Sequence, residues 1–302
     1  VSSGGTERVL TTKLNWWAKQ QDVNVTVVSL RENGEPFFTI DPGVERIILD
    51  VMPGDTAKYF SCLKSVVEKI KPDVMVAVAG MAVEVLPRLD DASKKVLEFH
   101  YTKIFLVNFV RGIHHIRFRQ LHLLKMRYLQ WRLARTAKKY DKFVGLTHRD
   151  IGLWGNPANM TFVHNPLSFR SPRKSTCENK RIISVGSWTP AKGMDQLLEA
   201  LGPLAKKYPD WTVDLFGSGQ DEMLLRSIIQ KYGMEKQVNL HSPVKNIGDY
   251  LVEASIYAFP SRSDGFGLVI TEAMECGLPT VAMDCECGPC EIVTENTGIV
   301  VP

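Results

Sequence analysis

Short apolar runs alternate with longer amphipathic stretches along the whole chain. Apolar runs of this kind, separated by helical stretches of roughly 10 to 15 residues, are typical of parallel strands whose two faces are both covered by helices. The pattern therefore predicts an α/β protein with doubly wound parallel sheets. The expected strands cover residues 25–30, 46–51, 73–80, 94–100, 142–147, 161–166, 181–187, 212–218, 238–243, 256–261, 279–285 and 298–302.

A polar stretch between residues 168 and 180 divides these strands into two series. It reads RSPRKSTCENK over most of its length and contains almost no apolar residue. Prolines, which break helices and strands, together with polar residues of this kind mark a boundary between domains. We therefore expect an α/β domain over residues 1–170 and a second over residues 171–302, facing a central cleft. Ligands of open parallel sheets bind at the carboxyl ends of the strands.

The candidate functional residues lie in loops at those expected strand ends. Gly4 and Gly5 stand in the first loop, and His100 follows the run that ends at Phe99. The later candidates lie in the turns 187–193 and 264–267. This agreement with the ligand-binding edge of the fold depends on the pattern alone.

Asp264 and Glu272 are the two acids of a Gly-rich turn and the helix expected after it. Asp264 precedes Gly265-Phe266-Gly267, and Glu272 lies about five residues into the helix. At roughly 1.5 Å per residue the two acids are about 8 to 12 Å apart. The amides at the start of such a helix can hold a phosphate. The alternative is that Asp264 only caps the helix while Glu272 is a solvated surface carboxylate.

Positive charge near the expected phosphate comes from Lys192 and Arg262. Lys192 precedes Gly193 in a turn, where it could bind phosphate or be solvated. Arg262, two residues before Asp264, could add charge or pair with a nearby carboxylate. The G-x-G of residues 217–219 is poor evidence for a nucleotide site, so we predict a loop there.

Gly4-Gly5 and His100 also leave two interpretations open. Paired glycines let a backbone approach a diphosphate closely, although such pairs are more often simple turns. A histidine at the end of a buried strand can contact a ligand or only pack and form hydrogen bonds. A lone histidine at such a position more often only packs and forms hydrogen bonds.

Composition limits the class of protein. The chain is 44% hydrophobic, has no apolar run long enough to span a membrane and shows no secretory signal, so we expect a cytoplasmic protein. It starts without Met and stops after a strand-like run, and we expect both ends to be trimmed. Cys285, Cys287 and Cys290 could supply three thiolates, but no fourth ligand stands at zinc-site spacing. We expect reduced thiols, no metal and no cofactor.

Residues 101–140 contain ten Lys or Arg and no Asp or Glu, whereas the whole chain has a net charge of only +4. Basic and aromatic mixtures adsorb to anionic lipid head groups. An anionic membrane surface, bound through residues 103–139 at the inner face of the membrane, is one interpretation. A solvated helix face is the other, and nucleic acid is disfavoured because no binding module accompanies the patch. The histidines and aromatic residues of this segment are His114, His115, His122, Phe105, Phe109, Phe118, Tyr128 and Trp131.

These motifs resemble the retaining glycosyltransferases of family 4, the glycosyl transferases group 1, which have the GT-B fold and build bacterial glycans, polysaccharide or lipopolysaccharide. The resemblance extends over the length of the chain and begins with the D-x7-E spacing from Asp264 to Glu272. The other segments that carry it are GGTER, DKFVGLTHRDIGLW, VHNPL, DGFGLVITEAMECGLPTVA and GPCEIV.

The resemblance implies transfer of a hexose or N-acetylhexosamine from a nucleotide diphosphate sugar to a glycan or lipid-linked acceptor, with retained configuration and no metal. It implies that Asp264 and His100 contact the sugar and that Glu272 contacts the ribose. It also implies a diphosphate site made by Lys192, the Gly4-Gly5 loop and the turn residues Gly265, Phe266, Gly267 and Leu268.

The chain departs from the family at Ser187, where the family has an Arg that neutralises the diphosphate. One missing charge at developing negative charge can cost roughly 3 kcal/mol. Two other functions stay open, and the Ser187 departure allows the second of them. One is a nucleotide-sugar epimerase of the same fold, and the other is a non-catalytic nucleotide-sugar-binding partner in a glycan-assembly complex.

Overall fold

The computed structural model describes residues 4–31, 34, 36–103, 119–285 and 287–302. Every apolar run predicted as a strand coincides with or overlaps a strand in the structure. The strands are β1 Val25–Ser29, β2 Val44–Ile48, β3 Val74–Ala77, β4 Lys94–Glu98, β5 Lys142–Gly145, β6 Met160–Phe162, β7 Arg181–Val185, β8 Thr212–Phe216, β9 Val238–His241, β10 Ile256–Phe259, β11 Thr280–Met283 and β12 Gly298–Val301.

Helices separate most of these strands, and a side chain caps the first turn of two of them, at Asp55 and at Thr147. Asp55 accepts a hydrogen bond from the amide of Lys58 at 3.0 Å, which satisfies one of the unpaired amides at the start of α2. The helices are α1 Gly5–Trp17, α2 Thr56–Ile70, α3 Ala82–Val85, α5 Arg119–Ala137, α6 His148–Trp154, α7 Met194–Ala205, α8 Glu222–Tyr232, α9 Ile247–Leu251, α10 Leu268–Glu275 and α11 Pro289–Ile292, with the short 3-10 turns η1 Leu86–Arg88 and η2 Pro190–Lys192.

The chain divides into two compact units. The first comprises Val1–His100 with Leu129–Ser168, and the second comprises Tyr101–Tyr128 with Phe169–Pro302. The sequence places a boundary near residue 170, and the later of these unit boundaries falls between Ser168 and Phe169. The grouping of residues 101–128 with the second unit has no counterpart in the sequence pattern.

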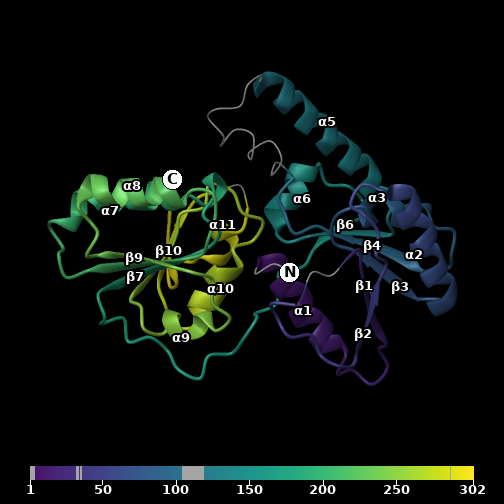
Figure 1. The fold of residues 1–302 in the computed structure, drawn as a ribbon, viewed down its shortest axis with the longest axis horizontal. Coiled ribbons are helices and arrows are strands. Elements are labelled where there is room, and N and C mark those ends of the chain that lie inside the picture. The colour runs from purple at the N-terminus through teal and green to yellow at the C-terminus, as the bar shows by residue number, and fades with distance from the viewer. Residues whose placement is uncertain (1–3, 32–33, 35, 104–118, 286) are drawn as a thin grey trace. The chain divides into compact units, whose positions relative to one another are not determined.

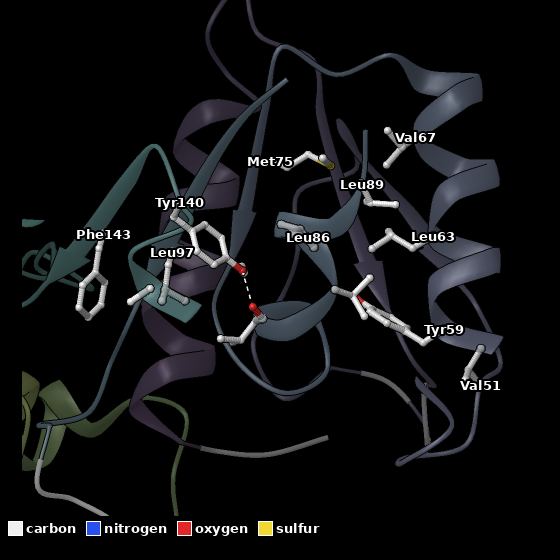
Figure 2. Close-up of a cluster of buried hydrophobic side chains, with 14 of the residues drawn as sticks. Val51, Tyr59, Leu63, Val67, Met75, Leu86, Leu89, Leu97, Tyr140 and Phe143 are labelled. Atoms are coloured by element: carbon white, nitrogen blue, oxygen red, sulfur yellow. Dashed lines mark hydrogen bonds between the residues drawn. The ribbon is translucent and has the colours of Figure 1, made fainter. Parts of the chain in front are cut away.

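The strands of the first unit are parallel and form two ladders. β1 pairs with β2, while β3, β4, β5 and β6 form a second sheet in sequence order. Figure 2 shows the core of this unit, where one face of α2 lines up Tyr59, Leu63 and Val67 against the chain around Leu86. The phenol of Tyr140 enters this core and donates to the carbonyl oxygen of Val83 at 2.9 Å. A buried hydroxyl is tolerated there because it has this partner.

The second unit holds one six-stranded parallel sheet in the order β12-β11-β10-β7-β8-β9. In Figure 1, where residues 169–302 run from green to yellow, α7 and α8 cover one face of this sheet while α9 and α10 cover the other. This is the doubly wound arrangement that the sequence predicts, so the predicted α/β class is confirmed. Strand order reverses between β7 and β10, and ligands of open α/β sheets bind where it does so.

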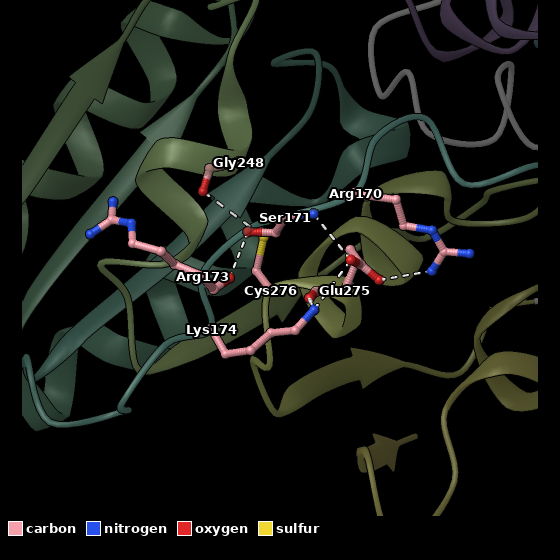
Figure 3. Close-up of polar contacts among 7 residues, drawn as sticks. All are labelled: Arg170, Ser171, Arg173, Lys174, Gly248, Glu275 and Cys276. Carbon is pink, nitrogen blue, oxygen red and sulfur yellow. Dashed lines mark hydrogen bonds and ion pairs between the residues drawn. The ribbon is translucent and has the colours of Figure 1, made fainter.

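The polar stretch after residue 168 is anchored to the second unit. Arg170 and Lys174 converge on Glu275, the last residue of α10, with nitrogen–oxygen distances of 3.3 and 3.2 Å (Figure 3). The amide of Ser171 donates to the same carboxylate at 3.0 Å. This backbone hydrogen bond and the two cations hold the pKa of Glu275 below its ordinary value.

α5 carries apolar residues on an exposed face as well as on a packed one. Leu133 and Ala134 pack against the core of the first unit. A stripe with helical spacing, Leu121, Leu124, Tyr128 and Trp131, is 53 to 63% exposed. Of the predicted basic and aromatic segment, residues 104–118 lie outside the described residues.

Across the part of the chain that the structure describes, the search for a helix long and apolar enough to cross a membrane finds no candidate.

Candidate active site

Two turns meet at the point where strand order reverses in the second unit. The amides of Arg262 and Ser263, after β10, both donate to the carbonyl oxygen of Ala191, after β7, at 2.9 and 3.2 Å. Gly193 has a φ of +65°, and a Cβ there would lie 2.0 Å from the carbonyl oxygen of Pro260. Only glycine permits this close approach. The backbone therefore fixes the position of Lys192, the residue before Gly193, against the second turn.

Lys192 and Asp264 form an ion pair across these turns. Lys192 Nζ lies 2.5 Å from Asp264 Oδ2, and the two side chains are 30% and 16% exposed. The other carboxylate oxygen accepts from the amides of Phe266 and Gly267 at 3.1 and 3.0 Å. Burial would raise the pKa of Asp264, but the Lys192 ammonium and these two amides outweigh it and hold the pKa below its ordinary value. Asp264 is thus a carboxylate that caps the turn and also binds the lysine.

α10 begins directly after this carboxylate. Gly267 takes the left-handed conformation with φ +88°, Phe266 is buried, and Leu268 is the first helical residue. Gly265 is half-buried. The amides of Phe266 and Gly267, which directly precede the helix, therefore point at the Asp264 side chain, where the helix dipole favours negative charge.

Glu272 lies in the interior instead of on the surface. It is the fifth residue of α10 and is 1% exposed, which contradicts the alternative of a solvated carboxylate. Tyr257 of β10 is fully buried beside it, and its hydroxyl has no hydrogen-bond partner among the described residues. Burial, followed by the carboxylates of Glu272 and Asp264, raises the pKa of Tyr257 well above its ordinary value. Tyr257 was not among the predicted site residues, although a hydroxyl inside an apolar strand is a signal for such a residue.

Arg262 pairs with a carboxylate, as one of its two interpretations allows. Its guanidinium forks onto Asp195 in the first turn of α7, with both nitrogen–oxygen distances at 2.7 Å, and also donates to the carbonyl oxygen of Pro190 at 2.8 Å. Burial would raise the pKa of Asp195, but Arg262 lowers it below its ordinary value. The arginine therefore joins the two turns.

Ser187 and the G-x-G segment lie next to these turns. Ser187 is exposed, with its Oγ 3.4 Å from Thr189 Oγ1. Residues 217–219 form a loop, as predicted, and a Cβ at Gly219 would lie 2.2 Å from the carbonyl oxygen of Trp188. Position 219 therefore needs a glycine, because the loop 217–219 packs directly on the turn that contains Trp188.

Gly4, Gly5 and His100 belong to the first unit. Gly4 is extended and precedes α1, and a Cβ on Gly5 would meet nothing within 4 Å among the residues that the structure describes. His100 is 9% exposed, and its Nε2 lies 3.0 Å from Glu98 Oε1 at the carboxyl end of β4. The structure thus brings together Lys192, Arg262, Asp264, residues 265–268 and Glu272 in one unit, and His100 with a carboxylate in the other.

The cysteines are free thiols. Cys285 and Cys287 are buried, and Cys285 Sγ donates to the carbonyl oxygen of Cys287 at 3.3 Å, whereas Cys290 is exposed. A search of the described residues finds no group of three or more His, Cys, Asp or Glu side chains that could hold a metal ion.

The second unit thus belongs to the class of doubly wound α/β proteins, whose ligands bind at the point where strand order reverses. Residues 169–302 match the family described as glycosyl transferases group 1. The chain is also 33% identical over 308 residues to an uncharacterized glycosyltransferase of Haemophilus influenzae, an alignment that covers 97% of this chain and 80% of the relative. The chain therefore belongs to the group 1 glycosyltransferases.

Solved structures show the same fold. WaaG, a glycosyltransferase involved in lipopolysaccharide biosynthesis, is 17% identical with a TM-score of 0.70, over all of this chain and 83% of WaaG. Anabaena HepE in complex with UDP and glucose is 18% identical with a TM-score of 0.71, over 99% of this chain and 83% of HepE. These neighbours are GT-B glycosyltransferases, so the predicted GT-B architecture is confirmed.

Proposed function

We propose that the chain transfers a hexose or N-acetylhexosamine from a nucleotide diphosphate sugar to a hydroxyl of a glycan or lipid-linked acceptor, with retained anomeric configuration. The Lys192–Asp264 pair at the sheet's switch point is the observation that carries this proposal. The UDP and glucose bound by HepE, which shares the fold, support a donor of this class.

Lys192 can serve the carboxylate and the donor together. An ammonium has three donors, and one of them is directed at Asp264. The two other N–H groups of the ammonium can bind diphosphate oxygens. Asp264 lies beside the ammonium, so it can accept a hydrogen bond from a hydroxyl of the sugar attached to that diphosphate. The amides from Gly265 to Leu268 add the positive end of the α10 dipole.

Glu272 has the proposed role of binding the ribose hydroxyls. Because Glu272 is only 1% exposed, this contact requires either that its side chain rotates toward the turn or that the ribose enters the interior. In the first unit, we assign the diphosphate approach to Gly4 and Gly5 and a sugar contact to His100. The space beside Gly5 is consistent with a ligand passing close to the backbone.

The leaving diphosphate develops negative charge that must be stabilised. Ser187 brings no charge, and the guanidinium of Arg262 is already forked onto Asp195. Lys192 and the α10 amides would therefore carry the stabilisation in a mechanism without metal. Removing a single donor of this kind costs roughly 3 kcal/mol in other enzymes.

We further propose that α5 holds the protein at an anionic membrane surface on the cytoplasmic side. Its exposed stripe ends at Trp131, over which the guanidinium of Arg135 lies 4.8 Å from the ring centroid. Each Lys or Arg near such a surface contributes about 1 kcal/mol. Co-sedimentation with vesicles that contain or lack phosphatidylserine tests this. Binding that needs the anionic lipid and falls in Leu124→Ser/Trp131→Ser supports it, and no difference between the two vesicles contradicts it.

The transfer itself is tested with radiolabelled UDP-, GDP- and ADP-sugars and a lipid and glycan extract as acceptor. The wild-type chain should label the extract, and Asp264→Asn should lower the rate by about a hundredfold or more. Asp210→Asn, an exposed carboxylate paired with Lys180, is the matched control. Sugar conversion without acceptor would indicate an epimerase, and donor binding without turnover would indicate the non-catalytic binder.

A further inference from the structure

Three polar groups of the first unit form a buried chain beside the expected sugar site. Lys13 of α1 directs its Nζ at both oxygens of Glu98, at 2.6 and 2.5 Å. Glu98 Oε1 in turn lies 3.0 Å from His100 Nε2. The side chains of Lys13, Glu98 and His100 are 23%, 11% and 4% exposed.

Stability alone does not account for this arrangement. Removing charges from water is unfavourable, and apolar side chains of similar volume would often be at least as stable as a buried ion pair. The chain of groups also stands at the carboxyl end of β4, the edge where parallel sheets bind their ligands. A role in a site is the simpler reason for its presence.

The hydrogen bonding determines which nitrogen of His100 carries a proton. Burial would raise the pKa of Glu98, but the hydrogen bond with His100 and the charge of Lys13 lower it to about 2. Glu98 is therefore an ionised carboxylate, which can only accept hydrogen bonds. The proton between Glu98 and His100 must then be on Nε2 of the imidazole, and in the neutral ring Nδ1 is left as the acceptor.

We propose that Glu98, held in place by Lys13, is a positioning residue that fixes the Nε2–H tautomer and the ring orientation of His100, so that Nδ1 is presented to a sugar hydroxyl. This inference rests on the proposed function only for the identity of the hydroxyl. Among the residues that the structure describes, no hydrogen-bond partner is found for Nδ1. An orienting carboxylate of this kind is a common partner of functional histidines.

The tautomer is measured directly by nitrogen NMR of the 15N-histidine-labelled full chain, with His100→Asn to assign the signals. In the wild-type protein at pH 8 the His100 ring should show a protonated Nε2 and an unprotonated Nδ1. In Glu98→Gln the amide can donate or accept, so a mixture of tautomers should appear. A protonated Nδ1 in the wild type would overturn the inference, whether or not any sugar is transferred.

Kinetics then test whether Glu98 acts through His100. Glu98→Gln should lower kcat/KM by about tenfold or more, and Lys13→Met by less, because the carboxylate remains. In a His100→Asn background, both substitutions should have less than about a twofold further effect, since coupled residues are not additive. All rates are measured below the melting temperature of each variant. If each substitution lowers kcat/KM by the same factor in the wild-type and the His100→Asn background, the role of Glu98 is purely structural.

The exposed pair of Glu84 with Arg132 supplies a matched control in the same unit. Glu84→Gln should leave the His100 signals and the transfer rate unchanged. If the wild-type chain transfers no sugar with any donor, the proposed function fails while the NMR result still decides the role of Glu98.

Discussion

Lys192 is the residue on which the proposed donor site depends most. It is the cation paired with Asp264, and its position is fixed by Gly193 on one side and by the backbone bonds to Ala191 on the other. An ammonium held this way is already oriented before a diphosphate arrives. Orientation before binding is what makes electrostatic stabilisation effective.

Replacing Lys192 by Met should therefore weaken donor binding and slow transfer more strongly than loss of a surface charge does. We expect kcat to fall by about a hundredfold, because the proposed role of the charge is to stabilise the leaving diphosphate. Steady-state kinetics measure this effect. Lys231→Met, which removes an exposed ion pair with Glu199, is the control, and an equal loss in both variants would contradict the role of Lys192.

At the level of single residues, the sequence predicts charged side chains in glycine turns but not their partners. The positions of Lys192 and Asp264 follow from the turn pattern. The pairing of Arg262 with Asp195 does not, because it joins side chains 67 residues apart. The burial of Glu272 was missed for a similar reason, since it depends on which face of α10 covers the sheet.

At the level of elements, the turn after β7 is shaped by close backbone contact with the turn after β10. Gly193 combines a left-handed φ with a Cβ position 2.0 Å from the carbonyl oxygen of Pro260. Gly233 has nearly the same φ, +66°, but a Cβ there would meet nothing within 4 Å in the described part of the chain. Substitution of Gly233 therefore tests backbone strain alone, whereas substitution of Gly193 tests backbone strain together with a steric clash.

Gly233→Ala should destabilise the chain by about 1 kcal/mol, which is the strain of the left-handed conformation. Gly193→Ala should destabilise it more and should also abolish donor binding, because the two turns must move apart. Thermal melting and calorimetric titration with the donor measure the two effects. Equal behaviour of both variants would show that the close approach to Pro260 is unimportant.

The stretch after residue 168 is bound to the end of α10, although its composition is that of a linker. We call the contacts of residues 170–174 with Glu275 the clamp. Glu275 binds Arg170, Ser171 and Lys174, so Glu275→Gln should loosen the stretch and lower the melting temperature. In limited proteolysis, the variant should then be cleaved within residues 170–180 faster than the wild type. Glu222→Gln, which breaks an exposed pair with Arg226, should leave the cleavage pattern unchanged. An unaltered pattern in both variants would contradict the clamp.

The order of strands could be predicted less well than their existence. Apolar runs locate the strands because burial on both faces leaves a continuous signal. Pairing depends on contacts between distant segments, and nothing in residues 25–48 indicates that β1 and β2 form a ladder of their own. The contacts of residues 170–174 with Glu275 could not be predicted either, because they join residues 101 to 105 positions apart.

At the scale of the whole molecule, ion pairs of buried and partly buried carboxylates make the stability of the protein depend on pH. Glu98, Asp195 and Asp264 all have lowered pKa values in the folded chain. A carboxyl group whose folded pKa is lowered stabilises the protein above its unfolded pKa and loses that contribution as the pH falls through the folded value.

For Glu98 the loss should occur between about pH 4.5 and pH 2, the ordinary and folded values of its pKa. The wild type should be more stable than Glu98→Gln at pH 7, and the difference should shrink across this range. Melting curves of both proteins at several pH values measure it. A difference that is constant with pH would contradict the ionised state of Glu98.

The central claim is that the second unit binds a nucleotide diphosphate sugar at the turns around Lys192 and Asp264. A thermal-shift titration with UDP-, GDP- and ADP-sugars tests it most directly, because a ligand that binds the folded state raises the melting temperature by an amount set by its affinity. At least one donor class should stabilise the wild-type chain and the Lys231→Met control, and should fail to stabilise Lys192→Met. A shift that persists unchanged in Lys192→Met, or no shift with any of the three donors, would contradict the claim.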